Sequence, residues 1–464
     1  MLSALRSVLA LLLAAVAAAA SGQPVGAASA PPLAASAPVP GAAASAAEAT
    51  PGPVSSAAQR VYEQMRPRLL QVRTLLKTQD SQSSVGSGFL VSTEGHLITN
   101  FHVVSQYALQ PQRNRLVYAT IDGQQGALQL LAFDVVHDLA LLKAVDPAPL
   151  AGRGAVGFRP DSETLPRGAR IFSLGNPLDV GFTVTEGSYN GPVERSFLRT
   201  LFFGGSLSPG MSGGPSLDET GRLVGVNVAT RRDGEQVSFL VPAAPAQALL
   251  ERGRLAKPLE APVYPEVARQ LLRHEAELTD RFVAQPWRPA GHARYAIPVP
   301  QETFLRCWGQ GSPQAARGLQ FERSDCEMDS RVFVSGSLLT GYLTVRHESY
   351  DGAKLGAVRF SQRYSASFQN EFMGGANRQL TAPRCLEQTV ARAGLPLRAV
   401  VCLRAYKKLE GLHELSVLVA TLDGAQVGVQ GRFDAHGVSF ASAQRLTKHY
   451  LDGFAWTAPK TASR

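Results

Sequence analysis

The sequence predicts an all-β fold with a helical interruption. Short apolar segments separated by turn residues dominate from about residue 69 to residue 241, with few helical segments among them. Many short strands with Gly and Pro between them are typical of a β-barrel or β-sandwich, not of a sheet built from alternating strands and helices. The same pattern returns from about residue 296. We therefore expect two β-rich parts joined by a helical spacer.

The first β-rich part is expected to begin with a short helix. Residues 58–65 have the pattern of a helix closed by Pro67, and the strand signals begin at Leu69. The clearest predicted strands are 88–92, 96–100, 116–121, 139–144, 170–174, 183–189, 223–229 and 237–241. A helix over about 245–252 follows the last of these strands.

A helical spacer over residues 255–290 is predicted next. Its apolar residues recur at spacings of four, seven and four, which places them on one face of a helix. They are Val267, Leu271, Leu278 and Phe282.

Strand signals after the spacer define the second β-rich part. They fall at 332–334, 338–345 and 358–360, and a hairpin is expected over 415–429 with its turn at Asp423-Gly424. We expect residues 291–464 to form a β-rich C-terminal domain, whose function the sequence does not reveal.

Composition limits the classes of protein to consider. The chain has 464 residues, 45% hydrophobic and 18% charged, which excludes a collagen, a coiled-coil rod and a wholly disordered chain. The formal net charge is +9, but the cationic residues are scattered without a basic run. We therefore expect no nucleic-acid partner.

The N-terminus predicts export. Arg6 precedes an uncharged apolar run over 8–20, and the small residues at its end form a cleavage site, as in a secretory signal peptide over 1–20. The run is shorter than the roughly 20 residues that cross a bilayer. We expect no membrane span after cleavage and a periplasmic or secreted protein, with an uncleaved signal anchor as the alternative. Residues 21–57, rich in Ala, Pro and Ser, are predicted to be a disordered linker.

All four cysteines lie in the second β-rich part, and an even number in an exported protein favours two disulfides. Three pairings are possible. The local one joins Cys307 to Cys326 and Cys385 to Cys402, and we favour it. The spacings do not match a zinc knuckle, so no metal is expected. Buried free thiols are the alternative.

The densest chemical signal is Ser-Pro-Gly-Met-Ser-Gly-Gly-Pro over 208–215. Glycines on both sides of Ser212 free the backbone for a tight turn and let a substrate carbonyl approach main-chain N–H groups. Ser212 is therefore a candidate nucleophile. The pattern also fits the nucleophile elbow of another hydrolase fold, but that elbow requires a helix directly after the serine. Residues 213–215, Gly-Gly-Pro, do not start a helix readily.

A serine hydroxyl becomes a nucleophile when an imidazole takes its proton and a third polar group orients that imidazole. His102 follows a predicted strand and is the candidate base. Asp138 opens a later apolar strand and is the candidate orienting group. Its neighbour His137 is expected to be a surface residue. The order His102, Asp138, Ser212 is that of the chymotrypsin barrel.

Several further motifs follow one another in the same order as in a known family. They are Gly86-Ser87-Gly88-Phe89, Thr99-Asn100-Phe101-His102-Val103-Val104, Asp138-Leu139-Ala140-Leu141-Leu142-Lys143, Gly175-Asn176-Pro177, Thr183-Val184-Thr185-Glu186-Gly187 and Gly210-Met211-Ser212-Gly213-Gly214-Pro215. Residues from about 86 to 250 thus resemble the protease domain of the HtrA (Deg) branch of trypsin-like serine proteases.

This resemblance implies a chymotrypsin-like double β-barrel over 58–254 and a serine endopeptidase that acts on protein or peptide substrates. Ser212 would attack the peptide carbonyl, His102 would transfer the proton and Asp138 would orient His102. The N–H groups of Gly210 and Ser212 would bind the oxyanion. No metal or cofactor is required.

The resemblance has two departures. The region after residue 254 does not resemble the PDZ domains usually attached to this branch, so the oligomeric state stays open. Residues 197–208, expected to form the wall of the specificity pocket, contain no acidic residue, although a preference for Arg or Lys needs a buried carboxylate. A small or apolar substrate side chain is the better prediction.

A second class of function stays open from the sequence. The chain would then be a catalytically silent, protease-fold binding or scaffold protein of the cell envelope. Ser212, His102 and Asp138 would then be present, but the turn that should bind the oxyanion would be collapsed. The C-terminal domain would hold a partner.

Overall fold

The structure is a computed structural model that describes residues 54–230, 236–288, 290–301, 303–313, 318–368, 373–423 and 426–457. The predicted signal peptide and nearly all of the predicted linker lie outside these residues, as does Gly424 of the predicted turn. In the ranges given, no helix combines the length and the apolar composition needed to cross a membrane.

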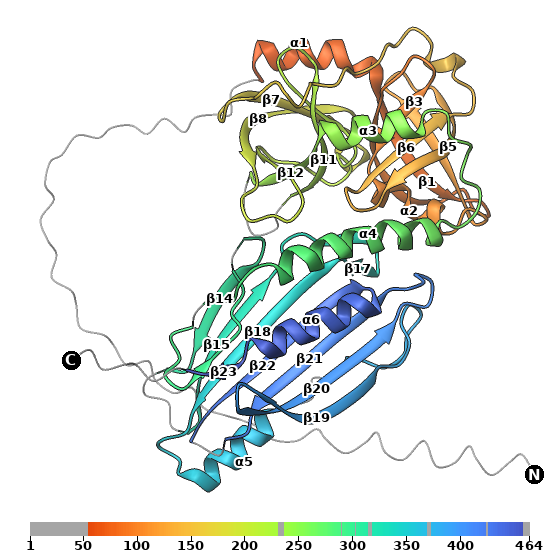
Figure 1. The fold of residues 1–464 in the computed structure, drawn as a ribbon. Coiled ribbons are helices and arrows are strands. Elements are labelled where there is room, and N and C mark those ends of the chain that lie inside the picture. Colours follow the sequence, from red (N-terminus) through yellow and green to blue (C-terminus); the bar gives the residue numbers. More distant parts are fainter. Residues whose placement is uncertain are drawn as a thin grey trace, which may run out of the picture. The chain divides into compact units, whose positions relative to one another are not determined.

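Two closed six-stranded barrels occupy the described part of residues 69–242 (Figure 1). The first contains β1 (Leu69–Leu76), β2 (Gln82–Leu90), β3 (His96–Thr99), β4 (Asn114–Thr120), β5 (Gln125–Asp134) and β6 (Leu139–Ala144), in the order β1-β2-β3-β6-β5-β4. The second contains β7 (Arg170–Gly175), β8 (Thr183–Pro192), β9 (Leu201–Gly204), β10 (Pro215–Leu217), β11 (Leu223–Thr230) and β12 (Ser238–Pro242), in the order β10-β11-β12-β9-β8-β7. The predicted chymotrypsin-like double barrel is confirmed.

The alternation of side chains along β1 explains how a barrel strand serves two cores. Successive side chains of a strand point to opposite faces. Leu70 and Val72 lie in the core that fills the first barrel. Leu69, on the other face, packs in a second core with Phe89 and with Val61 of the N-terminal helix. Because both faces are largely buried, apolar residues occur on both faces of the strand instead of alternating with polar ones.

Three helices and three 3-10 turns accompany the barrels. They are α1 (Ser56–Met65), α2 (Phe101–Leu109), α3 (Ala243–Gly253), η1 (Arg66–Arg68), η2 (Ala148–Leu150) and η3 (Pro177–Asp179), all within the described residues. α1 begins two residues before the predicted helix because the hydroxyl of Ser55 accepts a hydrogen bond from the Ala58 N–H and caps it. The sequence did not predict α2, which carries His102.

The predicted spacer helix is α4 (Tyr264–Val283), and its apolar face is buried as expected. Val267 and Leu271, in its first half, share a core with the first barrel. Leu278 and Phe282, in its second half, belong to the core of the C-terminal sheet. One helix therefore contributes to both cores.

The C-terminal region, residues 291–464, is built on a seven-stranded antiparallel sheet. In the described residues its order is β14 (Arg306–Gly311), β15 (Gln320–Glu327), β18 (Tyr342–Asp351), β22 (Val427–Val438), β21 (His413–Thr421), β20 (Leu395–Ala405) and β19 (Arg384–Arg392). The smaller pairs are β13 (Tyr295–Ala296) with β23 (Ala455–Trp456), and β16 (Val332–Ser335) with β17 (Leu338–Thr340). The expected β-rich character of this region is confirmed.

Helices cover both faces of this sheet (Figure 1). α4 and α6 (Phe440–Asp452) pack on the face that presents Phe433. α5 (Ala357–Ser367) packs on the other face, through contacts of Phe360 and Tyr364 with Tyr350. The sheet is thus the middle layer of the C-terminal region.

Two strand predictions need correction. Residues 358–360 lie in α5, where the buried Phe360 and Tyr364 are four residues apart and Val358 is 83% exposed, a helical and not an alternating pattern. The single strand expected over 338–345 is divided into β17 and β18 at Gly341, whose φ of +70° bends the chain.

Both predicted disulfides are present. Cys307 of β14 is bonded to Cys326 of β15, and Cys385 of β19 is bonded to Cys402 of β20. In each pair the cysteines stand directly opposite each other on adjacent antiparallel strands. The favoured local pairing is therefore confirmed, and each disulfide fastens an outer strand of the sheet to its neighbour.

We expect the disulfide at β19 to stabilise the C-terminal region. Most side chains of β19 are exposed, so few apolar contacts hold this strand. Replacing Cys385 and Cys402 together by Ala should lower the free energy of unfolding by about 3 kcal/mol, the value for a loop of this length. Urea denaturation measures the change, and hydrogen exchange should show β19 losing protection before the barrels do. Equal protection of β19 in the variant and in the native chain would contradict this prediction.

Candidate active site

The loop that carries Ser212 connects β9 to β10 and requires glycine at two positions. Gly210 and Gly213 have φ values of +94° and +84°. A Cβ atom on Gly210 would lie 2.5 Å from the carbonyl oxygen of Asn176, and one on Gly213 would lie 2.3 Å from the carbonyl oxygen of Ser87. Backbone conformation and close packing thus explain both glycines around Ser212.

His102 lies in the first turn of α2, directly after β3 ends at Thr99. Its Nδ1 is 2.6 Å from Oδ2 of Asp138, and its backbone N–H donates to Oδ1 of the same carboxylate at 2.8 Å. A carboxylate only accepts hydrogen bonds, so Nδ1 carries the proton. In the neutral ring, Nε2 therefore keeps a lone pair that can accept a proton.

Asp138 lies between β5 and β6 with a φ of +55°, a left-handed conformation that Asp tolerates better than most residues. Its carbonyl oxygen accepts from the Phe101 N–H at 3.1 Å and from the side-chain amide of Asn100 at 2.8 Å. Main chain and side chain of Asp138 thus both bind the start of α2. Sequence reasoning missed Asn100, although the motif around His102 contains it.

The environment of His102 changes its pKa. Burial disfavours the charged imidazole and lowers the pKa, but the negative charge of Asp138 and its hydrogen bond favour the charged form more strongly. The net result is a pKa raised above the ordinary value of 6.5.

The hydroxyl of Ser212 points to the main chain in this structure. It donates to the carbonyl oxygen of Val228 on β11 at 3.1 Å, and it makes no hydrogen bond with His102 among the described residues. Proton transfer to Nε2 of His102 therefore requires rotation of this hydroxyl about the Cα–Cβ bond.

Two main-chain N–H groups beside Ser212 are available to a ligand. Within the described ranges, the N–H groups of Gly210 and Ser212 donate no hydrogen bond. The carbonyl groups of the same residues are held by Ser87, whose hydroxyl donates to the Gly210 oxygen at 2.7 Å and whose N–H donates to the Ser212 oxygen at 2.8 Å. Ser87 therefore holds the peptide units that follow Gly210 and Ser212. The units that carry the two N–H groups are held through the Pro209 carbonyl, which accepts from the Leu178 N–H, and the Met211 carbonyl, which accepts from the Gly214 N–H. The Gly-Ser-Gly-Phe motif contained Ser87, but its role needed the structure.

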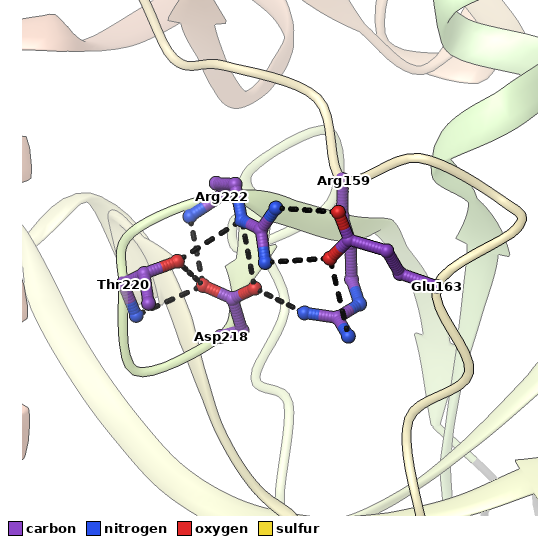
Figure 2. A network of polar contacts seen from close by, with 5 residues as sticks. All are labelled: Arg159, Glu163, Asp218, Thr220 and Arg222. Carbon is purple, nitrogen blue, oxygen red and sulfur yellow. Dashed lines mark hydrogen bonds and ion pairs between the residues drawn. The ribbon is translucent and has the colours of Figure 1, made fainter.

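The β10–β11 hairpin, which follows the loop, is closed by a network of charged residues (Figure 2). One oxygen of Asp218 accepts from the main-chain N–H groups of Thr220 and Arg222, and the other is 2.7 Å from Nη1 of Arg159. Arg222 also pairs with Glu163 at 2.8 Å. Burial raises the pKa of Asp218, but these hydrogen bonds outweigh it and the pKa is lowered. The ionised Asp218 thus holds the turn that leads into β11, the strand that carries Val228.

Helix α4 holds the segment that leads to Asp138. The Gln270 side chain accepts from the Val135 N–H at 2.8 Å and donates to the Phe133 carbonyl at 3.1 Å. Gln270 is buried and bridges the last residues of β5 to the spacer helix. The position of the candidate orienting carboxylate therefore depends partly on α4.

His137 is not part of the group formed by His102 and Asp138. Its Nδ1 lies 3.0 Å from the carboxylate of Asp134, which is also 3.2 Å from Arg252. Burial raises the pKa of Asp134, but the hydrogen bond and charge of His137 outweigh it and lower the pKa to about 2. His137 is partly exposed and belongs to a separate ion-pair cluster.

The segment expected to form the specificity pocket is only partly free for that task. The Phe197 ring packs at 5.3 Å from His274 and 5.4 Å from Phe304, centroid to centroid. Phe197 is therefore part of the C-terminal core. Phe203 is buried in the core of the second barrel. The prediction of a small or apolar substrate side chain thus depends on the remaining residues of the segment.

Residues 86–226 match the family model described as "Trypsin-like peptidase domain". The putative serine protease HhoB of Synechocystis sp. is 28% identical over 257 residues, which are 50% of this chain and 58% of that protein. The serine protease Do-like HtrA of Bacillus subtilis is 26% identical over 302 residues, 60% of each chain. The probable periplasmic serine endoprotease DegP-like of Marinomonas sp. is 31% identical over 185 residues, 38% of this chain and 36% of that one.

The chain thus spans less than two thirds of the length of these relatives. The matched residues lie within the two barrels, which extend from residue 69 to residue 242. They include His102 and Asp138, which are in contact, and the Ser212 loop. Residues 86–226 of this chain thus match a trypsin-like peptidase domain, and the chain is similar there to the HtrA and DegP-like serine proteases.

Proposed function

We propose that this chain is an exported serine endopeptidase that hydrolyses peptide bonds in protein substrates through Ser212, His102 and Asp138. The observation that carries this proposal is the double hydrogen bond from His102 to the Asp138 carboxylate. It leaves Nε2 of the ring as the basic nitrogen. Catalysis also needs a site for developing negative charge, and the main-chain N–H groups of Gly210 and Ser212, which donate to no described residue, supply it.

The proposed reaction has two steps with an acyl-enzyme between them. The Ser212 hydroxyl turns from the Val228 carbonyl to His102 and gives its proton to Nε2 as its oxygen attacks the peptide carbonyl. The N–H groups of Gly210 and Ser212 bind the resulting oxyanion. His102 then gives the proton to the leaving amine, and the C–N bond breaks. Water, deprotonated by the same imidazole, hydrolyses the ester and restores the serine.

Asp138 has a distinct task in this scheme. The imidazole becomes positively charged when it takes the serine proton, and the adjacent carboxylate stabilises that charge. The raised pKa of His102 reflects the same stabilisation in the resting protein. Asp138 is a positioning and charge-stabilising residue that does not itself take the proton.

Export is the second part of the proposal. The predicted signal peptide, together with two disulfides, fits a chain that folds in an oxidising compartment. Relatives such as that from Marinomonas sp. are named periplasmic endoproteases. We therefore propose a periplasmic or secreted location with protein or peptide substrates.

The alternative is a protease fold without catalysis, a binding or scaffold protein of the cell envelope. One observation favours it: the Ser212 hydroxyl is bound to Val228 and not to His102. A fluorophosphonate probe separates the two functions, because it labels a serine only when a base activates it. Labelling of Ser212 supports the peptidase, and its absence in the native chain supports the scaffold.

We expect Ser212→Ala to abolish proteolysis and leave the fold intact, because the change removes one partly exposed hydroxyl and no core volume. Casein hydrolysis measures activity, and circular dichroism measures the fold. Ser162→Ala, which alters an exposed serine elsewhere, is the matched control and should keep native activity. Hydrolysis that survives the loss of Ser212 would refute the proposed nucleophile.

The pH dependence of activity should follow the raised pKa of His102. Only the neutral imidazole accepts the serine proton, so activity is lost as pH falls and His102 becomes charged. We expect kcat/KM to increase with pH through an apparent pKa above about 6.5, the value of an unperturbed imidazole. Peptide hydrolysis between about pH 5 and 9 at constant ionic strength measures it. A flat profile, or a midpoint on the acid side of 6.5, would argue against this base.

Asp138→Asn should lower kcat by about four orders of magnitude, as loss of the orienting carboxylate does in such triads. Asn tolerates the left-handed backbone at this position, so the variant should fold. The apparent pKa of His102 should also fall, because the neighbouring negative charge is gone. Asp134→Asn, which makes the same change beside His137, is the control and should retain most of the activity. Equal losses in the two variants would contradict a special role of Asp138.

A further inference from the structure

An apolar surface of the C-terminal region lies beside the imidazole of His102. The hairpin β16–β17 packs against α2, and the Phe333 ring meets the His102 ring edge-on, with 5.9 Å between centroids and 73° between planes. Phe333 stands directly opposite Leu339 on the hairpin. Neither the barrels nor the motifs of the sequence predict this contact, because the hairpin lies more than 200 residues after His102.

The alternation of side chains divides the hairpin into two faces. Val332 and Val334 are buried in the core shared with α2 and α4. Phe333 and Leu339 alternate with these residues; Phe333 packs against the edge of the same core but is partly exposed, and Leu339 is 45% exposed. We call the surface formed by Phe333 and Leu339 the apolar platform.

Hydrogen bonds fix the base of the hairpin. The Thr340 hydroxyl lies 3.0 Å from the Tyr406 hydroxyl in a buried contact. The Gly341 N–H donates to the His436 carbonyl at 2.9 Å, and the Gly341 carbonyl accepts from Nε2 of His274 on α4 at 3.1 Å. The hairpin is thus attached to both the sheet and the spacer helix, and the apolar platform is held as a preformed wall.

We propose that the apolar platform is a substrate-binding subsite that takes a large apolar side chain of the peptide next to the bond that is cut. This inference rests on the proposed peptidase function. During acyl transfer the leaving nitrogen must lie within hydrogen-bond distance of His102, so the flanking residues of the peptide are within one residue length, about 3.5 Å, of that position. A ring at 5.9 Å from the imidazole is within reach of their side chains.

The chemistry of the apolar platform selects the class of side chain. Phe333 and Leu339 carry no polar atom in their side chains, so covering them with Leu, Phe or Met removes apolar surface from water on both partners. A charged side chain would lose hydration there without gaining a partner. The C-terminal region thereby supplies a specificity-determining residue to a site whose proposed catalytic residues all come from the barrels.

A peptide library digested by the native chain and by Phe333→Ala tests the subsite. Mass spectrometry of the products gives the residue preference at each position around the cut. We expect the native chain to prefer large apolar residues at one flanking position. In Phe333→Ala, kcat/KM for such peptides should fall about tenfold, because the pocket loses much of an apolar side chain. For peptides with a small residue at that position, kcat/KM should change little.

Two further variants make the result specific. Phe333→Leu keeps an apolar wall and should restore most of the preference. Phe440→Ala removes an exposed Phe elsewhere in the same region and should leave the preference unchanged. Thermal unfolding of each variant checks that the fold is kept.

The outcomes separate this inference from the function on which it rests. An unchanged residue preference in Phe333→Ala would overturn the subsite. An equal rise in activity on all peptides would also overturn it, because the apolar platform would then block access to the site. Absence of any Ser212-dependent cleavage by the native chain would overturn the proposed peptidase, and the subsite with it.

Discussion

The rest of the candidate site depends on the contact between Asp138 and His102. One carboxylate binds two donors of the same residue, the ring Nδ1–H and the main-chain N–H at the start of α2. The direction of the imidazole is therefore tied to the direction of the helix. The main chain of Asp138 adds a further bond to the N–H of Phe101, so neither the ring nor the helix can turn alone. In the proposed reaction Ser212 is then the group that moves, because rotation of a hydroxyl costs far less than rotation of a helix.

The C-terminal region contributes to this arrangement through two elements. Gln270 of α4 binds the main chain just before Asp138, and the β16–β17 hairpin presents Phe333 to the ring of His102. Both elements are anchored in a hydrophobic core that also contains Phe101 of α2. The C-terminal region thus contacts the candidate site in two ways, through hydrogen bonds of Gln270 and through apolar contacts of the β16–β17 hairpin.

Local sequence patterns were sufficient for the β-rich character of the barrels and the apolar face of α4, and they favoured the observed pairing of the cysteines, whereas the double barrel was implied by the resemblance to the HtrA branch. Each pattern depends on residues close in the chain: short strands between turns, a helical period, and cysteines 17 and 19 residues apart. The motifs also named Asp138 and His102, which the structure brings into contact. Patterns failed at Phe360, because a segment as short as Val-Arg-Phe over 358–360 is equally compatible with a strand and a helix. They also failed at Ser87 and Phe333, because their roles come from contacts between segments far apart in the sequence.

The two disulfides have a consequence for how the outer strands align. A strand that shifts by one residue turns every side chain to the opposite face, and burial of one face normally forbids such a shift. The exposed side chains of β19 and β14 give little penalty of that kind. Cys385 and Cys402, like Cys307 and Cys326, can bond only when they stand opposite each other. The two disulfides thus set the register of β14 and β19, the outer strands whose exposed side chains do not set it.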